Sequence, residues 1–301
     1  MDLKKKLPYL RIVCNYSDGC NFNCSWCHHE GIYKAREYPL MTPQQIGNVS
    51  AMFYKLGVRK YKILGGEPTL REDLDEIIYN IRNIDEDIDI SIVTNGHRLE
   101  NKIIEYKNAG LTRVNVSLFT LDEEYFEKNI GNINLFRNVI RGIDAAVELG
   151  MVSKINHIYH NTEDFIQVLR FASKRDIRVN LLNEIPSQNG GKYTDIRKLV
   201  NLLQEIGVKS AEIENDPFSL PVMVYKLTNG VSVEIKHLTI CEQKLFNTCE
   251  GCYAIDKCKE GIFAVRLTPE GKVRPCLVRT DNQFEIMGKN NNELRQYLHE
   301  L

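Results

Sequence analysis

The sequence predicts an α/β protein, a partial (β/α)6 TIM barrel followed by a cysteine-rich C-terminal extension. Runs of β-forming residues alternate with helical patterns over about the first 190 residues, and such alternation demands a parallel sheet with helical crossovers. Beyond Asn189 the pattern changes, and five of the nine cysteines follow in the last part of the chain. We therefore expect a barrel core over residues 1–190 and an extension over residues 191–301.

The first β/α unit shows clear boundaries. Residues 10–14 form an apolar run typical of a strand. After Met41, the sequence offers Thr42 as a helix N-cap, Pro43 at the first helical position and Gln45 in the capping-box position. This helix is predicted to end near Gly57.

Five further strands are predicted, each followed by apolar residues at helical spacing: residues 60–64, 88–94, 113–118, 154–158 and 177–182. In a barrel of six such units, the chemistry belongs at the C-terminal ends of the strands. In the extension we expect a helix over residues 194–206 and a hairpin over residues 222–235 that turns at Thr228, Asn229 and Gly230. The extension is expected to pack on the barrel.

Composition narrows the class of protein. The 39 basic and 40 acidic residues give a formal net charge of -1, which argues against nucleic acid or an anionic membrane as a partner. The N-terminus lacks the apolar stretch of a signal peptide, and no run is long enough to span a bilayer, so we expect a cytoplasmic protein. Nine cysteines in a reducing compartment indicate metal or redox chemistry rather than disulfides.

Cys20, Cys24 and Cys27 form a CxxxCxxC motif directly after the first predicted strand. Three thiolates on one short loop can hold three irons of a [4Fe-4S] cluster and leave the fourth iron open to a small chelating molecule. The alternative is a structural zinc site in which His28 or His29 is the fourth ligand.

With Trp26 before its third cysteine, this motif resembles that of the radical S-adenosylmethionine (SAM) superfamily. The resemblance continues in residues that are implied to contact SAM: Gly65, Gly66, Glu67 and Pro68 at its amino group, and Thr94, Asn95 and Ser117 at its ribose and carboxylate. It further implies reductive cleavage of SAM to methionine and a 5'-deoxyadenosyl radical, with a flavodoxin or ferredoxin as reductant. On their own, these residues also fit ordinary turns.

A second cysteine group contains Cys241, Cys249, Cys252, Cys258 and Cys276, and a hairpin that turns at Gly271 lies between the last two. This region resembles the auxiliary-cluster region of SPASM and twitch proteins. The resemblance implies a second [4Fe-4S] cluster held by Cys249, Cys252, Cys258 and Cys276. Spacing alone also permits a four-cysteine zinc site. Cys241 is then a spare ligand or a hydrogen donor to a substrate radical.

Within the superfamily, nearly the whole chain resembles the MoaA-type GTP cyclases, through segments such as GGEPTLREDL and RLTPEGKVRPCL. This resemblance implies that Arg71, Lys154 and Arg266 lie near a nucleotide, although surface ion pairing is the alternative for each. The chain departs from that family at Gly19 and Ala264, where the family has arginines, and in lacking its C-terminal Gly-Gly. Substrate recognition is therefore expected to differ.

The leading hypothesis is a radical SAM enzyme that abstracts hydrogen from a small polar substrate, either a sugar or aminoglycoside-like intermediate or a nucleotide. Such an enzyme is expected to be an epimerase or a dehydrogenase. The alternatives are GTP 3',8-cyclisation in molybdenum cofactor biosynthesis, peptide modification, and a noncatalytic iron-sulfur or zinc protein.

Overall fold

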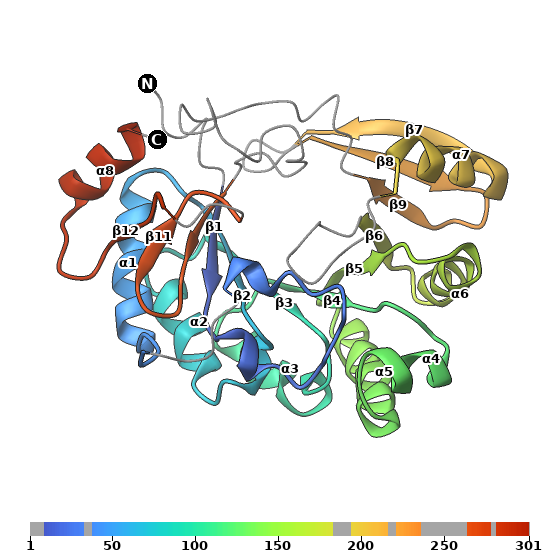
Figure 1. Ribbon diagram of the computed structural model, residues 1–301, viewed down its shortest axis with the longest axis horizontal. Coiled ribbons are helices and arrows are strands. Elements are labelled where there is room, and N and C mark those ends of the chain that lie inside the picture. Colours follow the sequence, from blue (N-terminus) through green and yellow to red (C-terminus); the bar gives the residue numbers. More distant parts are fainter. Residues whose placement is uncertain are drawn as a thin grey trace.

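The computed structural model describes residues 9–32, 38–182, 194–215, 221–235, 264–277 and 281–300. Strands and helices alternate through most of this length (Figure 1). The strands are β1 (Tyr9–Val13), β2 (Lys60–Leu64), β3 (Asp89–Thr94), β4 (Arg113–Ser117), β5 (Val152–Ile158), β6 (Arg178–Leu182), β7 (Val208–Glu214), β8 (Val222–Leu227), β9 (Ser232–Ile235), β10 (Ala264–Leu267), β11 (Lys272–Arg274) and β12 (Phe284–Glu285). The α-helices are α1 (Pro43–Lys55), α2 (Leu74–Arg82), α3 (Leu99–Asn108), α4 (Glu123–Asn129), α5 (Ile133–Glu148), α6 (Thr162–Ser173), α7 (Ile196–Ile206) and α8 (Asn291–Glu300).

The described strands form one curved, open sheet in the order β12-β11-β10-β1-β2-β3-β4-β5-β6-β9-β8-β7. Neighbouring strands from β1 to β6 are parallel, as six successive β/α units require. The fold class predicted from the sequence is confirmed. All six predicted barrel strands are present, with boundaries shifted by at most two residues.

Local sequence signals set the helix starts. The Thr42 hydroxyl accepts a hydrogen bond from the Gln45 backbone N–H at 3.3 Å, and the Gln45 side chain accepts one from the Thr42 N–H at 2.8 Å. This reciprocal pair is the predicted capping box. Asn132 and Asn161 cap α5 and α6 without a reciprocal bond, each through a side-chain oxygen that accepts one backbone N–H.

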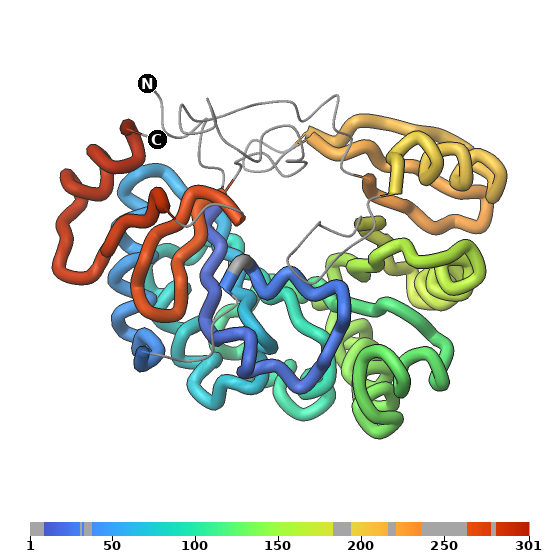
Figure 2. Tube along the Cα trace, viewed as in Figure 1, coloured from blue at the N-terminus to red at the C-terminus, as the bar shows by residue number. Residues whose placement is uncertain are grey.

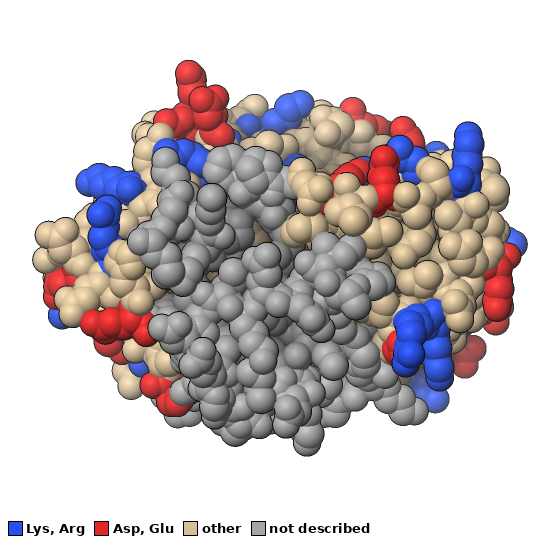
Figure 3. Space-filling view, turned by 90° about the horizontal axis from the view of Figure 1, so that it is seen from above, with Lys and Arg blue, Asp and Glu red and all other residues tan. Residues whose placement is uncertain are grey.

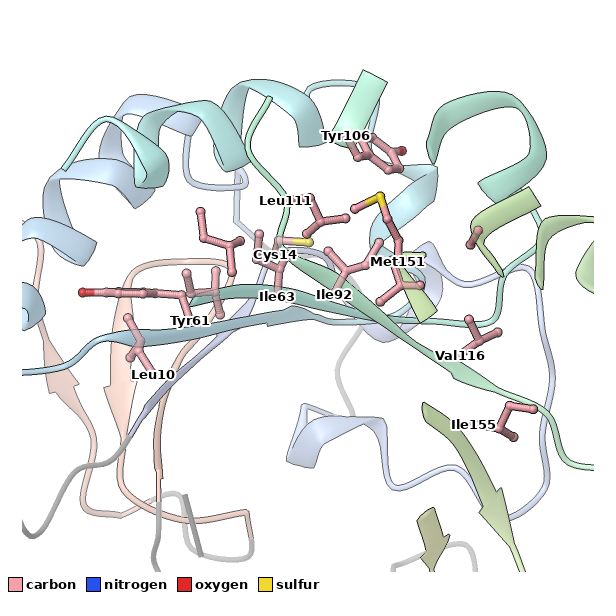
Figure 4. Packing of buried hydrophobic residues seen from close by; sticks show 14 of the residues in the cluster. Leu10, Cys14, Tyr61, Ile63, Ile92, Tyr106, Leu111, Val116, Met151 and Ile155 are labelled. Atoms are coloured by element: carbon pink, nitrogen blue, oxygen red, sulfur yellow. The ribbon is translucent and has the colours of Figure 1, made fainter. Parts of the chain in front are cut away.

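The core lies between the sheet and the helices on its outer face. Tyr61 and Ile63 of β2 are fully buried there, and Figure 4 shows them beside Leu10 of β1 and Ile92 of β3. Because side chains alternate across a strand, the intervening residues point to the opposite, inner face of the curved sheet. That inner face is polar, and it carries Arg11, Lys62, Ser91 and Arg113, among others.

The C-terminal extension joins the barrel at both edges of the sheet. Figure 2 shows β10 and β11 alongside β1, although about 250 residues separate them in sequence, and β10 pairs with β1 in parallel. At the other edge β9 pairs with β6, and β8 and β7 follow antiparallel to it. The expectation that the extension packs on the barrel is confirmed for these strands. The division at residue 190 stays a prediction.

Charged side chains of both signs are mixed around the rim of the face shown in Figure 3. Within the described ranges, no helix combines the length and the apolar character that crossing a membrane requires.

Candidate functional site

The cluster loop, which we define as residues 14–32, leaves the C-terminal end of β1 and carries Cys20, Cys24 and Cys27. Backbone donors already face two of these thiols. The Phe22 N–H lies 3.4 Å from Cys20 Sγ, and the His29 N–H lies 3.4 Å from Cys27 Sγ. N–H groups directed at sulfur are typical of loops that bind iron-sulfur clusters, because they stabilise negative charge on the sulfur.

The three thiols share a poorly solvated environment. Burial raises the pKa of Cys20 to about 11 and also raises the pKa values of Cys24 and Cys27. Cys20 and Cys27 each act on the charge of Cys24, so the side chains are electrostatically coupled. A bound metal would displace the protons of the three thiols, since the thiolate is the form of cysteine that binds metal. This donor set fits an iron-sulfur cluster, although no preassembled group of three or more metal ligands is found among the described residues.

The GGEP loop, residues 65–68 after β2, lies against the cluster loop. The Gly66 N–H donates to the Asn15 carbonyl at 3.2 Å, and the Glu67 N–H donates to the Gly19 carbonyl at 3.0 Å. A Cβ atom at Gly66 would lie 2.3 Å from the Tyr16 carbonyl oxygen. Glycine is therefore required at this position, because backbone atoms cannot move aside as side-chain ends can.

Glu67 is buried, and its carboxylate joins the ends of β2 and β3. Oε1 accepts from the Thr69 N–H at 3.0 Å, the Thr69 hydroxyl at 2.6 Å and the Thr94 hydroxyl at 2.5 Å, while Oε2 accepts from the Asn95 N–H at 2.7 Å. Burial raises the pKa of Glu67, and these donors partly offset the shift. The side chain expected at the SAM amino group is thus engaged within the protein, and it fixes the backbone of the predicted SAM site.

Asn95 extends this network to the cluster loop, because its Nδ2 donates to Asn21 Oδ1 at 2.7 Å. Sequence reasoning did not single out Asn21, because it occupies one of the positions that the CxxxCxxC motif leaves open. Ser117 ends β4 and lies in register with Asn156 of β5. Trp26 is buried, with its ring centroid 4.3 Å from that of His160.

The three basic residues expected near substrate all have partners. Arg71 is buried, and it donates to the Cys14 carbonyl at 2.8 Å, the Met41 carbonyl at 2.6 Å and the Asp73 carboxylate at 2.5 Å. These contacts are with the protein's own backbone and one acid, and they give Arg71 a structural role.

Lys154 and Arg266 lie on the inner face, and each pairs with a buried acid. Lys154 forms an ion pair with Glu234 of β9, and Arg266 lies 3.3 Å from Glu30. Burial acts to raise the pKa of Glu30, but Arg11, His28 and Arg266 lower it to about 2.

Lys62 is the inner-face residue that sequence reasoning missed. It lies in register with Arg11, and its ammonium group is 5.0 Å from the ring centroid of Tyr9. Within the described part of the chain its ammonium makes no ion pair. Burial lowers the pKa of Lys62 to about 7, with further lowering by Arg11, Lys154 and Arg113. Its three basic neighbours are each paired with a carboxylate, Arg11 with Glu30, Arg113 with Asp89 and Lys154 with Glu234, so among these four described residues the ammonium of Lys62 is the one without an acidic partner.

Cys276 follows β11 and is partly exposed. The other cysteines expected at an auxiliary cluster or as a spare ligand, Cys241, Cys249, Cys252 and Cys258, lie outside the described residues. Cys14, the last residue of the first predicted strand, is buried, and burial raises its pKa to about 12.

A family model described as the radical SAM superfamily matches residues 14–174. A protein from Methanococcus aeolicus named probable GTP 3',8-cyclase is 36% identical over 293 residues, which cover 94% of this chain and 89% of that relative. A protein of the same name from Methanococcus maripaludis is 34% identical over 286 residues, which cover 92% of this chain and 89% of the relative.

Among solved structures, the crystal structure of Streptococcus suis SuiB bound to S-adenosylmethionine superposes with a TM-score of 0.63 and 17% sequence identity. The match covers 95% of this chain and 63% of SuiB, so the chain spans less than two thirds of that protein. At this identity the likeness concerns the fold alone, and it agrees with the curved parallel sheet.

Proposed function

Because this chain belongs to the radical SAM superfamily, we propose that it removes a hydrogen atom from a nucleoside triphosphate, and that the nucleotide is GTP. The protein is an enzyme that uses a [4Fe-4S] cluster and SAM. The relatives named GTP 3',8-cyclase favour this activity over the epimerase or dehydrogenase reaction that the sequence placed first.

The observation that carries the proposal is the basic group on the inner face. Lys62 lies among Arg11, Arg113 and Lys154, and this surrounding charge contributes to its low pKa. A bound triphosphate would supply the missing negative charge, and it would favour the charged form of Lys62. This group lies on the inner face of the sheet, whose C-terminal strand ends carry the predicted SAM site, so one bound nucleotide would extend from the basic group toward SAM.

Each part of the site then has its own task. We assign the cluster to Cys20, Cys24 and Cys27, and the SAM contacts to the backbone of residues 65–68 together with Thr94, Asn95 and Ser117. When bound, the cluster and SAM supply a 5'-deoxyadenosyl radical. The protein's own residues hold SAM against the cluster loop and direct the nucleotide toward it.

An auxiliary [4Fe-4S] cluster held by Cys249, Cys252, Cys258 and Cys276 is part of this proposal. Its support is the position of Cys276, which follows the β10-β11 hairpin, and this hairpin pairs with β1 of the barrel. Sequence spacing supports the other three ligands. Iron and zinc analysis of wild-type protein and a Cys276→Ala variant would separate a second cluster from a zinc site: the cluster predicts lost iron in the variant, and a zinc site predicts lost zinc.

The proposed reaction has a direct isotopic test. A 3',8-cyclase must remove the hydrogen at C3' of GTP before a bond to C8 can form. With GTP deuterated at C3', SAM and dithionite, we expect 5'-deoxyadenosine to carry one deuterium. GTP deuterated at C2' is the matched control, and it should give unlabelled 5'-deoxyadenosine. Unlabelled product from both substrates, with no increase in SAM cleavage over a GTP-free reaction, would contradict the proposal.

A second candidate substrate is a small polar molecule without phosphates. It is favoured by the carboxylates on the inner face, because Glu30 and Glu234 already neutralise Arg266 and Lys154. A Cβ atom at Gly19 would lie 2.4 Å from the Asn15 side chain, so an arginine there would require that side chain to move. Stimulation of SAM cleavage by aminoglycosides or sugars, without stimulation by GTP, would favour this candidate.

A further inference from the structure

The side-chain amide of Asn21 is a buried hydrogen-bond donor that lacks an acceptor. Its Nδ2 atom is inaccessible to solvent and makes no hydrogen bond in the described structure. A buried donor without an acceptor has lost its hydrogen bonds to water and gained none in return, so such a group needs an explanation. Asn21 stands directly after Cys20 in the cluster loop, where a cofactor is expected.

The orientation of this amide follows from its neighbours. The His97 N–H donates to Asn95 Oδ1 at 3.0 Å, which fixes which end of the Asn95 amide carries oxygen. Asn95 Nδ2 therefore donates to Asn21 Oδ1. Since Asn21 Oδ1 accepts this bond, the N–H2 group is the end of the Asn21 amide that has no hydrogen-bond partner.

The side chain that precedes Asn21 in the sequence is the Cys20 thiol, a ligand of the proposed cluster. The Phe22 N–H already donates to Cys20 Sγ at 3.4 Å, so this segment directs a hydrogen-bond donor at sulfur. A thiolate or sulfide of a bound cluster would offer the acceptor that Nδ2 lacks.

We infer that Asn21 donates a side-chain N–H to S hydrogen bond to the SAM-binding cluster, and that Asn95 holds it in the donating orientation. The inference rests on the proposed placement of the cluster at Cys20, Cys24 and Cys27. Such a bond stabilises the reduced, more negative cluster, and therefore raises its reduction potential. Asn21 and Asn95 are positioning residues that set how readily the cluster accepts an electron.

The test is the reduction potential of the cluster without SAM, measured by dithionite titration with redox mediators and electron paramagnetic resonance. In an Asn21→Asp variant, we expect the equilibrium constant for one-electron reduction to fall at least tenfold, which corresponds to about 59 mV. Asn23→Asp is the matched control, because it makes the same change on the same loop at an exposed side chain. The equilibrium constant for one-electron reduction of this control should stay within threefold of the wild-type value.

A second variant keeps the cysteine loop intact. Asn95→Asp replaces the donor that faces Asn21 with an oxygen, so the Asn21 amide should turn its N–H2 group toward that oxygen and away from the cluster. We expect the same fall in potential as in Asn21→Asp. Unchanged potentials in both variants would overturn the inference, and so would a change that occurs only after SAM is added, which would place the acceptor on SAM. A wild-type protein that forms no [4Fe-4S] spectrum would instead overturn the cluster assignment itself.

Discussion

The Glu67 carboxylate accepts the backbone N–H of Asn95 at 2.7 Å, and this bond joins the loop after β2 to the end of β3. Through Asn95 and Asn21 the same network reaches the cysteine motif. The cluster loop, the GGEP loop and the end of β3 are thus one connected unit, and substitutions within it should affect SAM binding and folding together.

A Glu67→Gln variant should be less stable and should bind SAM more weakly. In either orientation the new amide places an N–H2 group against a backbone N–H, that of Thr69 or that of Asn95, and one buried donor loses its acceptor. We expect a loss of about 1–3 kcal/mol in the free energy of unfolding. Urea denaturation and SAM titration measure the two effects.

Glu72→Gln is the control for this substitution, because Glu72 is largely exposed and pairs with Arg98 at the surface. Its effect should be below about 1 kcal/mol. Equal stability of the two variants would contradict the structural role of Glu67.

A Gly66→Ala variant should fail to close the cluster loop onto the GGEP loop. The added methyl group would lie within 3 Å of two backbone oxygens, those of Tyr16 and Gly19. We expect a loss of about 1–3 kcal/mol or more, as for overpacked cores, together with weaker SAM binding. Gly131→Ala meets only the flexible end of Leu135 at 2.9 Å, and should cost less. Thermal unfolding of both variants checks the difference, and a greater loss in Gly131→Ala would contradict it.

Nucleotide binding should take up protons at pH 8. The pKa of Lys62 is lowered to about 7 in the free protein, so most of this lysine is neutral at pH 8. A triphosphate favours the charged form and raises that pKa, so a proton binds together with the nucleotide. The affinity for GTP should therefore fall as the pH rises from 7 to 9.

Calorimetry in two buffers of different ionisation enthalpy measures this uptake directly. A Lys62→Met variant should lose the proton uptake and most of the pH dependence. Identical proton uptake in wild type and variant would show that another group carries the linkage.

An Arg71→Met variant should lose stability rather than substrate recognition. The change removes a buried guanidinium from the carbonyls of Cys14 and Met41 and from Asp73. Hydrogen bonds to charged groups contribute about 1.5–3 kcal/mol, so we expect a loss of at least about 2 kcal/mol. Urea denaturation measures it. A variant with wild-type stability and greatly weakened GTP binding would return Arg71 to the substrate site.

The barrel could be predicted from the sequence because its signals are local. Alternating burial marks β2, and the capping box at Thr42 marks the start of α1. Strand β7 was missed because most of its residues are exposed, and its pairing with β8 depends on a partner that follows later in the chain.

The site could be predicted only in part, because its decisive contacts are long-range. The cysteine and glycine motifs are continuous in sequence, so they were recognised. The bond between Asn21 and Asn95 joins residues 74 positions apart, and the charge around Lys62 arises from strand register. The sequence places Arg71 near substrate, and it could not show that the guanidinium meets the Cys14 and Met41 carbonyls and the Asp73 carboxylate.

Cys20, Cys24 and Cys27 are proposed to hold the cluster at which SAM is reductively cleaved. The most direct measurement is 5'-deoxyadenosine formation, with iron content, in anaerobically reconstituted wild type and a Cys24→Ala variant. We expect SAM cleavage in the wild type under dithionite, and in the variant a loss of about four irons together with loss of cleavage. Cleavage at the wild-type rate in the variant, or no cleavage by fully iron-loaded wild type, would contradict this account.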